Sequence, residues 1–415
     1  MKKRGIYNKA ILIVCFVGFT WMASGQELAY FIDKAIANNP GLQAYKVKYE
    51  IANEAVKETE ALPNTEFGFG YFVSEPETRT GAQKARISLK QMLPWFGTIT
   101  ARENYAASLA ETTYQELVIM QRKLVLSVSQ SYYNLYTIRA KENVINEKLT
   151  LLKTYEELAL TALEVGQASA VDILKLQIRK NELKAQVEIL QKQFEAEKSV
   201  LVQLMNLKEL NSVNFPLTLD LPEEDMLQTN DSLWFHPELE TYEKLYNSVE
   251  KSILLNQKEA NPAIGFGLDY IAVAERPDQF FNDNGKDIFM PMVSLSIPLF
   301  NNSYRSKSKQ LDLRKKEIKS LQKERRNMLE MLLTKAFQQR ERARTTCKTQ
   351  DQNLKHARDA EEILLKTYEN GSISFTDVLE IQELQLEFLL KKLDAVASYF
   401  VASANINYLI GNSKK

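Results

Sequence analysis

Residues 165–177 read VGQASAVDILKLQ, and residues 369–382 read ENGSISFTDVLEIQ. In both stretches a glycine is followed by a serine and then, six residues after the glycine, by an aspartate that opens a new apolar run. Glycine can end a helix in the left-handed conformation, and Ser and Asp favour the start of the next helix. The two stretches therefore predict the same sharp helix-to-helix turn, at Gly166 and again at Gly371.

Each turn follows a long segment that lacks proline and internal glycine, which predicts helices over residues 97–164 and 303–369. At the rise of an α-helix each of them spans about 100 Å. Shorter helices are predicted at 41–61, 170–206, 238–260 and 374–410. In each half the two short helices together match the long one, so we expect them to stack end to end beside it, with a heptad seam at Leu176, Leu183 and Leu190.

Four segments alternate with period two, which predicts strands at 65–73, 83–93, 263–273 and 288–298. One face is apolar and is expected to meet lipid: Phe67, Phe69, Ile87, Leu89, Phe266 and Leu295. The other face is expected to meet water in a barrel lumen: Glu66, Lys84, Arg86, Lys90 and Asp269. Such strands fit an outer-membrane barrel. Four strands cannot close one, so at least three copies are needed for twelve strands around an aqueous lumen.

The sequence contains an internal repeat. His236-Pro237 stands 197 residues after Asn39-Pro40, and IGFG at 264–267 stands 197 residues after FGFG at 67–70. We therefore divide the chain into a first repeat over 26–235, which ends in an irregular equatorial segment at 207–235, and a second repeat over 236–415. The predicted fold class is mainly α with a membrane β-barrel portion, in which long antiparallel helical hairpins form an α-barrel.

The first 25 residues predict a signal peptide, because basic residues precede the apolar run 10–19 and Ala23-Ser24-Gly25 offers a cleavage site. An uncleaved membrane anchor is the alternative. Removing four basic residues leaves 49 against 53 acidic ones, a formal charge of −4, and nothing indicates a nucleic-acid partner.

The remaining chemistry-bearing residues are few. Cys15 leaves with the signal peptide, so Cys347 has no disulfide partner. His236 and His356 are expected to be ordinary surface or cap residues. Met290 and Met292 are expected to be barrel residues. No set of nucleophile, acid-base or metal ligands converges, so we expect neither an enzyme nor a cofactor.

These residues resemble the TolC family of outer membrane efflux proteins, whose repeats carry a glycine and then an Asp-(Val/Ile)-Leu run six residues later. Here the motif is Gly166 with Asp172-Ile173-Leu174, and Gly371 with Asp377-Val378-Leu379. The resemblance covers nearly the whole mature chain, including the strand exit LPWFG at 93–97. It implies a homotrimeric twelve-stranded barrel that continues into a periplasmic helical tunnel, docked through a periplasmic adaptor on an inner-membrane pump of the RND or ABC type.

The resemblance also implies roles for particular residues. The turns would meet the adaptor at Val165, Gly166, Gln167, Asn370, Gly371 and Ser372. The periplasmic aperture would be gated at Asp172, Tyr368, Asp377 and Glu380. The chain departs from some family members at Ile373, where they have an arginine.

A ring of carboxylates makes physical sense at such an aperture. Asp377 and Glu380 lie one helical turn apart on one face, so copies of both would gather negative charge at one constriction. The alternative is that Asp172 and Asp377 only stabilise the first turn of a helix.

The leading hypothesis for function is a passive exit duct of a tripartite efflux or type I secretion system. A soluble periplasmic coiled-coil scaffold is the alternative. Export of heavy metals, drugs or proteins is equally compatible with the sequence.

Overall fold

The computed structural model describes residues 23–164, 169–210, 216, 218–225, 236–278, 280, 282–299, 302–369, 373 and 375–410. Its contacts divide into two compact units. One contains the residues up to Ala44, Val118–His236 and Arg326–Lys415, and the other contains Tyr45–Leu117 and Pro237–Arg325. Each unit therefore combines segments from both halves of the sequence.

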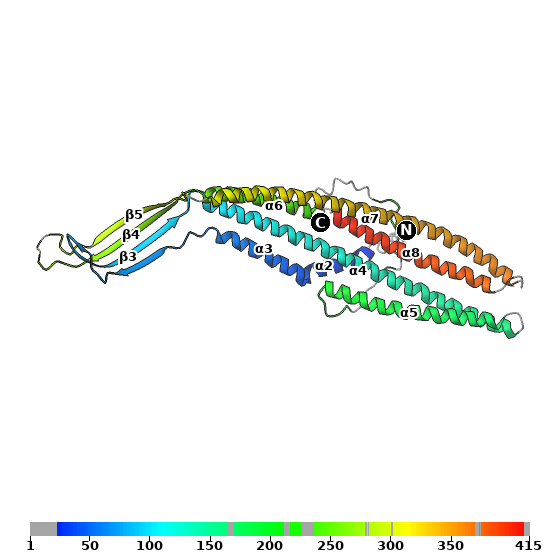
Figure 1. Cartoon of the computed structure of the whole chain (residues 1–415). Coiled ribbons are helices and arrows are strands. Elements are labelled where there is room, and N and C mark those ends of the chain that lie inside the picture. The colour runs from blue at the N-terminus through cyan, green and yellow to red at the C-terminus, as the bar shows by residue number, and fades with distance from the viewer. Residues whose placement is uncertain are drawn as a thin grey trace, which may run out of the picture. The chain divides into compact units, whose positions relative to one another are not determined.

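Helices make up most of the described chain (Figure 1). Their bounds are α2 (Ala23–Asn38), α3 (Pro40–Glu58), α4 (Thr98–Glu164), α5 (Ala170–Leu204), α6 (Pro237–Glu259), α7 (Ser303–Glu369) and α8 (Phe375–Ile410). The helices α4 and α7 have 67 residues each, as the lack of proline and glycine predicts. The helix α2 begins at Ala23, within the predicted signal peptide, whose residues 1–22 lie outside the described residues.

The four predicted strands form one antiparallel sheet in the order β1 (Glu66–Tyr71), β3 (Gly81–Leu93), β4 (Ala263–Val273) and β5 (Ile288–Ser296). A short strand, β2 (Glu77–Thr78), pairs with the start of β3. The pairing of β3 with β4 joins the two halves of the sequence. The prediction of a mainly α fold with an antiparallel β portion is confirmed, while closure of this sheet into a membrane β-barrel stays a prediction. Among the described strands, β1 and β5 are the edges of the sheet.

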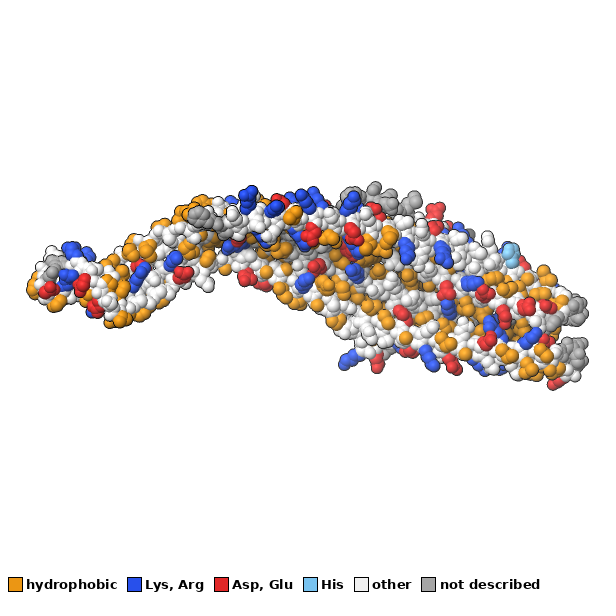
Figure 2. Space-filling view, in the orientation of Figure 1, with side chains coloured by type: hydrophobic (Ala, Val, Ile, Leu, Met, Phe, Trp, Pro, Cys, Tyr) orange, Lys and Arg blue, Asp and Glu red, His pale blue; other side chains and the backbone are white. Residues whose placement is uncertain are grey.

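The register of the sheet separates its two faces. Phe69, Ile87, Tyr270 and Phe289 stand opposite one another across the four strands, and their side chains are 69%, 40%, 42% and 67% exposed. The next row, on the other face, is Gly68, Ser88, Asp269 and Met290. One face is thus apolar and open to the surroundings, and Figure 2 shows hydrophobic side chains along this sheet.

The unit that contains α5 has a hydrophobic core between α4, α5 and α8. Its buried members are Ile145, Leu152, Tyr155, Ala159, Ile173, Leu176, Leu183, Leu190, Val378, Leu379 and Leu386. Leu176, Leu183 and Leu190 are at most 7% exposed, so the predicted seam lies in this core. The three helices are therefore held together by side chains that recur at heptad spacing.

Two contacts join helix ends within the unit that contains α5, while the end-to-end stacking of the short helices stays a prediction. The Asn39 side-chain amide, at the junction of α2 and α3, donates to the Leu204 carbonyl at the end of α5 over 2.9 Å. In the other half, His236 directly precedes α6 and lies edge-on to the Tyr408 ring near the end of α8, with 5.5 Å between ring centroids. His236 is 1% exposed, so of the expected surface or cap position only the position directly before a helix holds, and the Tyr408 ring contributes to its burial.

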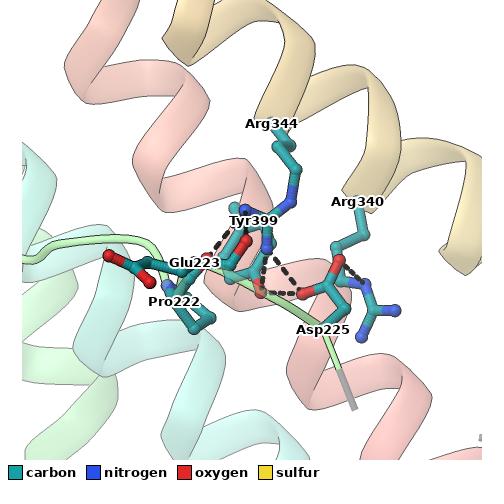
Figure 3. A network of polar contacts seen from close by, with 6 residues as sticks. All are labelled: Pro222, Glu223, Asp225, Arg340, Arg344 and Tyr399. Carbon is teal, nitrogen blue, oxygen red and sulfur yellow. Dashed lines mark hydrogen bonds and ion pairs between the residues drawn. The ribbon is translucent and has the colours of Figure 1, made fainter. Parts of the chain in front are cut away.

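A segment at 218–225 crosses α7 and α8 and is fastened there by Arg344 (Figure 3). The Arg344 guanidinium donates to the Pro222 carbonyl over 2.7 Å and to Asp225 over 2.8 Å. Tyr399 of α8 also donates to Asp225, and Arg340 lies 3.4 Å from its second oxygen. Although burial works to raise it, the hydrogen bonds from Tyr399 and Arg344 hold the pKa of Asp225 below its usual value.

We predict that Asp225→Asn lowers the free energy of unfolding by about 3 kcal/mol, because it leaves two largely buried arginines without their carboxylate. Urea denaturation of the purified protein, followed by circular dichroism, measures this. Glu224→Gln changes an exposed neighbour in the same segment and is the matched control. Equal stability of the two variants would contradict the role given to Asp225.

Candidate functional site

The candidate site lies where α5 and α8 begin, directly after the two predicted turns. Ser169 caps α5, since its hydroxyl accepts a hydrogen bond from the Val171 amide over 3.2 Å. Asp172 lies in the first turn of α5 and Asp377 in the first turn of α8, where the helix dipole favours an acid. The six predicted adaptor-docking residues, Val165, Gly166, Gln167, Asn370, Gly371 and Ser372, lie outside the described residues.

The first turns of α5 and α8 touch through polar side chains. The Thr376 hydroxyl donates to Asp172 over 3.2 Å, and the Lys175 ammonium donates to the same hydroxyl over 3.2 Å. Asp172 and Thr376 are 204 residues apart in the sequence. The structure thus brings the predicted gate residue Asp172 next to the residue that precedes Asp377.

The other predicted gate residues have different surroundings. Asp377 and Glu380 are exposed, and neither has a hydrogen-bond or ion-pair partner in the part of the chain that the structure describes. Tyr368 is half-buried and packs against the core between α4, α5 and α8. The two acids are therefore open to solvent in a single copy, while Tyr368 supports the core beneath them.

Glu380 lines a cavity of about 450 Å³ between α4, α5 and α8. Basic side chains share this cavity: Lys148 from α4, and Lys175 and Arg179 from α5. Arg179 lies 2.8 Å from Glu182 and 3.4 Å from Glu383. The cavity wall therefore carries both signs of charge, so nearby cations partly balance Glu380.

Sequence reasoning missed a buried polar network beside this cavity. Gln382 is 0% exposed and accepts a hydrogen bond from Lys148 over 2.6 Å. Its amide nitrogen lies 2.6 Å from both the Tyr155 hydroxyl and the Glu361 carboxylate. The available signal was a glutamine among the apolar positions Val378, Leu379 and Leu386 of α8, since a polar residue in such a seam fixes the register of packed helices.

The same contact occurs in the first half of the chain. Gln177 donates to Glu156 over 3.1 Å, and these residues precede Gln382 and Glu361 by 205 positions, the displacement of the two turn glycines. Lys180 also donates to Glu156 and lowers its pKa. The repeat therefore extends from the backbone pattern to side-chain hydrogen bonds between the helices on either side of each turn.

Burial perturbs two groups of the network. It lowers the pKa of Lys148 to about 8, with a further lowering by Arg179, while Glu361 and Glu383 act in the opposite direction. Burial also raises the pKa of Tyr155. The helix contact at Gln382 therefore contains a lysine whose pKa lies near 8, well below the usual value for lysine.

The predicted lumen residues lie together on the polar face of the sheet. Arg86 forms an ion pair with Asp269, whose side chain is fully buried, and Lys84 forms one with Glu75. Lys90 lies 3.9 Å from Glu66. The cations on this face thus have acidic neighbours, which leaves a polar surface of mixed charge.

The described residues contain no group of three or more His, Cys, Asp and Glu side chains placed to hold a metal ion. Among the described helices, none combines the length and apolar character of a membrane-spanning helix.

Solved structures of outer membrane proteins share this fold. VceC from Vibrio cholerae matches with a TM-score of 0.74 at 15% identity, over 94% of this chain and 98% of VceC. The Campylobacter jejuni CmeC outer membrane channel matches with 0.72 at 15% identity, over 94% and 87%. The open state of the Neisseria gonorrhoeae MtrE outer membrane channel matches with 0.74 at 15% identity, over 94% and 90%. No protein-family model and no curated protein matches the sequence.

We predict that Lys148→Met removes a rise of stability with pH. Below pH 8 Lys148 is protonated whether the protein is folded or unfolded. Between about 8 and the unfolded value of 10.5 only the unfolded chain keeps the proton, so stability rises with pH in this window. The midpoint of thermal unfolding, measured from pH 7 to 11, should therefore climb more in the parent protein than in Lys148→Met.

Lys153→Met, at an exposed position of the same helix, is the control and should follow the parent curve. A constant difference between the parent and Lys148→Met across this range would show that the Lys148 pKa is not lowered.

Proposed function

We propose that this chain, which has the fold of the TolC-family outer membrane channels, is the outer-membrane exit duct of a tripartite efflux or type I secretion system. Substrates would be handed to it by an inner-membrane pump through a periplasmic adaptor, and would pass through it passively. This assignment gives the two faces of the sheet and the contacts at the helix ends a common purpose.

The sheet is the observation that carries the proposal. Its apolar face exposes Phe67, Phe69, Val293 and Leu295 by 56–75%, which is costly in water and favourable in lipid. Its opposite face carries the ion pairs of Arg86 and Lys90. A wall with one lipid-compatible and one water-compatible face is what a barrel strand requires.

The edges of the sheet support assembly into a trimer. Among the described strands β1 pairs only with β3, and β5 only with β4, so each has one row of backbone groups without a strand partner. If β1 of one copy pairs with β5 of the next, three copies close a twelve-stranded barrel. The exposed apolar face also disfavours the alternative of a soluble scaffold, which would hold that face in water.

We assign the gate of the duct to Asp172, Tyr368, Asp377 and Glu380. In three copies the exposed Asp377 and Glu380 would gather around one opening, and their mutual repulsion would make closure marginal. The contact of Asp172 with Thr376 would hold α5 against α8 at this level. The six turn residues next to it, Val165, Gly166, Gln167, Asn370, Gly371 and Ser372, are the proposed adaptor contacts.

Planar-bilayer recording tests the duct and its gate. We expect the parent protein to form channels, and Asp377→Ala combined with Glu380→Ala to raise their conductance and reduce their preference for cations. Both effects follow from removing the ring of carboxylates, and they are limited by the nearby Lys175 and Arg179.

The control is Glu188→Ala combined with Glu195→Ala, which removes two exposed acids from α5 away from its first turn. This control should leave conductance and selectivity unchanged. The acidic gate would be refuted if the parent and the Asp377/Glu380 variant had the same conductance and cation selectivity. The duct itself would be refuted if the parent protein formed no channel.

A further inference from the structure

The first turns of α7, where it leaves the sheet, carry a strong excess of positive charge. Residues 303–325 contain nine Lys or Arg and three Asp or Glu residues. In contrast, acids outnumber bases in α6 and in residues 98–117 of α4. Figure 2 shows Lys and Arg side chains gathered over the part of α7 next to the sheet. The charge therefore belongs to one helix rather than to this unit as a whole.

The face of α7 that points away from α6 combines these cations with an exposed leucine. Leu311 and Ile318 are buried and pack with Val249 and its neighbours on α6. Helical periodicity places Lys309, Leu313 and Lys316 on the opposite face. Leu313 is 57% exposed, and Arg305, Lys309 and Lys316 have no ion-pair partner within the described ranges.

The helix α3 has a matching face of opposite charge. Its inner side contacts α4, since the rings of Tyr49 and Tyr114 are 5.3 Å apart. The side away from α4 carries Val47, Ile51, Glu54 and Glu58. Val47 and Ile51 are 51% and 65% exposed. Among the described residues, Glu54 forms an ion pair with Lys57 on its own helix, an exposed pair of little energetic weight.

We propose that this face of α3 docks on this face of α7 in a neighbouring copy of the chain. The inference rests on the proposed function, because barrel closure pairs β1 of one copy with β5 of the next. The helix α3 leads into β1, and α7 leaves β5. Closure at these edges therefore brings α3 and α7 of adjacent copies side by side and antiparallel.

The residues on the two faces match in an antiparallel register. Counting away from the sheet, the pairs are Glu58 with Arg305, Glu54 with Lys309, Ile51 with Leu313, and Val47 with the aliphatic stem of Lys316. Successive residues in this set are three or four positions apart on both helices, so the rows stay aligned to within about 1.5 Å at each step. The seam has two ion pairs near the sheet and an apolar part below them.

Anionic phospholipid headgroups are the rival occupant of the basic face, since α7 starts next to the apolar sheet. Two observations favour the neighbouring copy. Leu313 lies among the cations and would gain nothing from a headgroup, and Ile51 needs an apolar partner on the acidic helix. Charge complementarity between the two faces completes the match.

Charge reversal on each helix tests the seam in the full-length protein in detergent. We expect Glu54→Lys with Glu58→Lys to lower the temperature at which the trimer dissociates by several degrees, and Arg305→Glu with Lys309→Glu to do the same. Combining all four substitutions should restore most of the loss, because the two ion pairs re-form with opposite sense. The control combines the α3 reversals with Lys307→Glu and Lys323→Glu, which lie outside the register, and should show no restoration.

The seam would be refuted if the fourfold variant did not recover the dissociation temperature lost in the two reversals. It would also be refuted if neither reversal lowered that temperature. A loss seen only for the α7 reversal, and only when phosphatidylglycerol is present, would overturn it in favour of a lipid site. If either of these results is found while the parent protein still forms conducting trimers, the seam is wrong and the proposed function stands. A parent protein that is monomeric and forms no channel refutes both proposals together.

Discussion

The structure depends on one constraint: a sheet of four long strands presents an exposed apolar face and has two open edges. Both features are unfavourable for a single copy in water, because exposed apolar surface and unpaired strand edges promote association. A closed barrel in lipid resolves both conditions at once. In the proposed duct, this requirement accounts for the assembly of several copies.

The helices satisfy a second constraint, since a helix of 67 residues needs a neighbour along its whole length. Along part of α4, the core shared with α5 and α8 supplies this neighbour, and the Asn39 amide contacts the end of α5 at Leu204. At the far end of the long helices the repeat reproduces a Gln–Glu hydrogen bond, with Gln177 on Glu156 and Gln382 on Glu361. In the first repeat Gln177 is exposed, whereas in the second repeat the equivalent Gln382 is buried. Equivalent residues of the two repeats therefore have different surroundings.

Much of this architecture could be predicted from the sequence, because alternation and the absence of helix breakers are local properties. Phe67 and Phe69 alternate with glycines, and their strand formed as expected. Gln382 escaped prediction, because its burial depends on Lys148, Tyr155 and Glu361, which are distant in the chain. The burial of His236 likewise depends on a distant residue, Tyr408. The hydrogen bond of Arg344 to segment 218–225 could not be predicted because this segment has no hydrophobic periodicity. The gate and docking roles came from a family resemblance and stay predictions, and among the proposed gate residues the structure shows the contact of Asp172 with Thr376.

In the proposed barrel, the apolar face of the sheet meets lipid while the polar face meets water. Phe69 and Gly70 are adjacent on β1 and point to opposite faces, and a side chain at Gly70 has open space around it. Cys347 is buried, so single cysteines placed at either position can be labelled selectively with a fluorophore. In reconstituted vesicles we predict that lipid-borne quenchers act on the label of Phe69→Cys and that aqueous iodide acts on that of Gly70→Cys. Quenching of both labels by iodide alone would contradict the account.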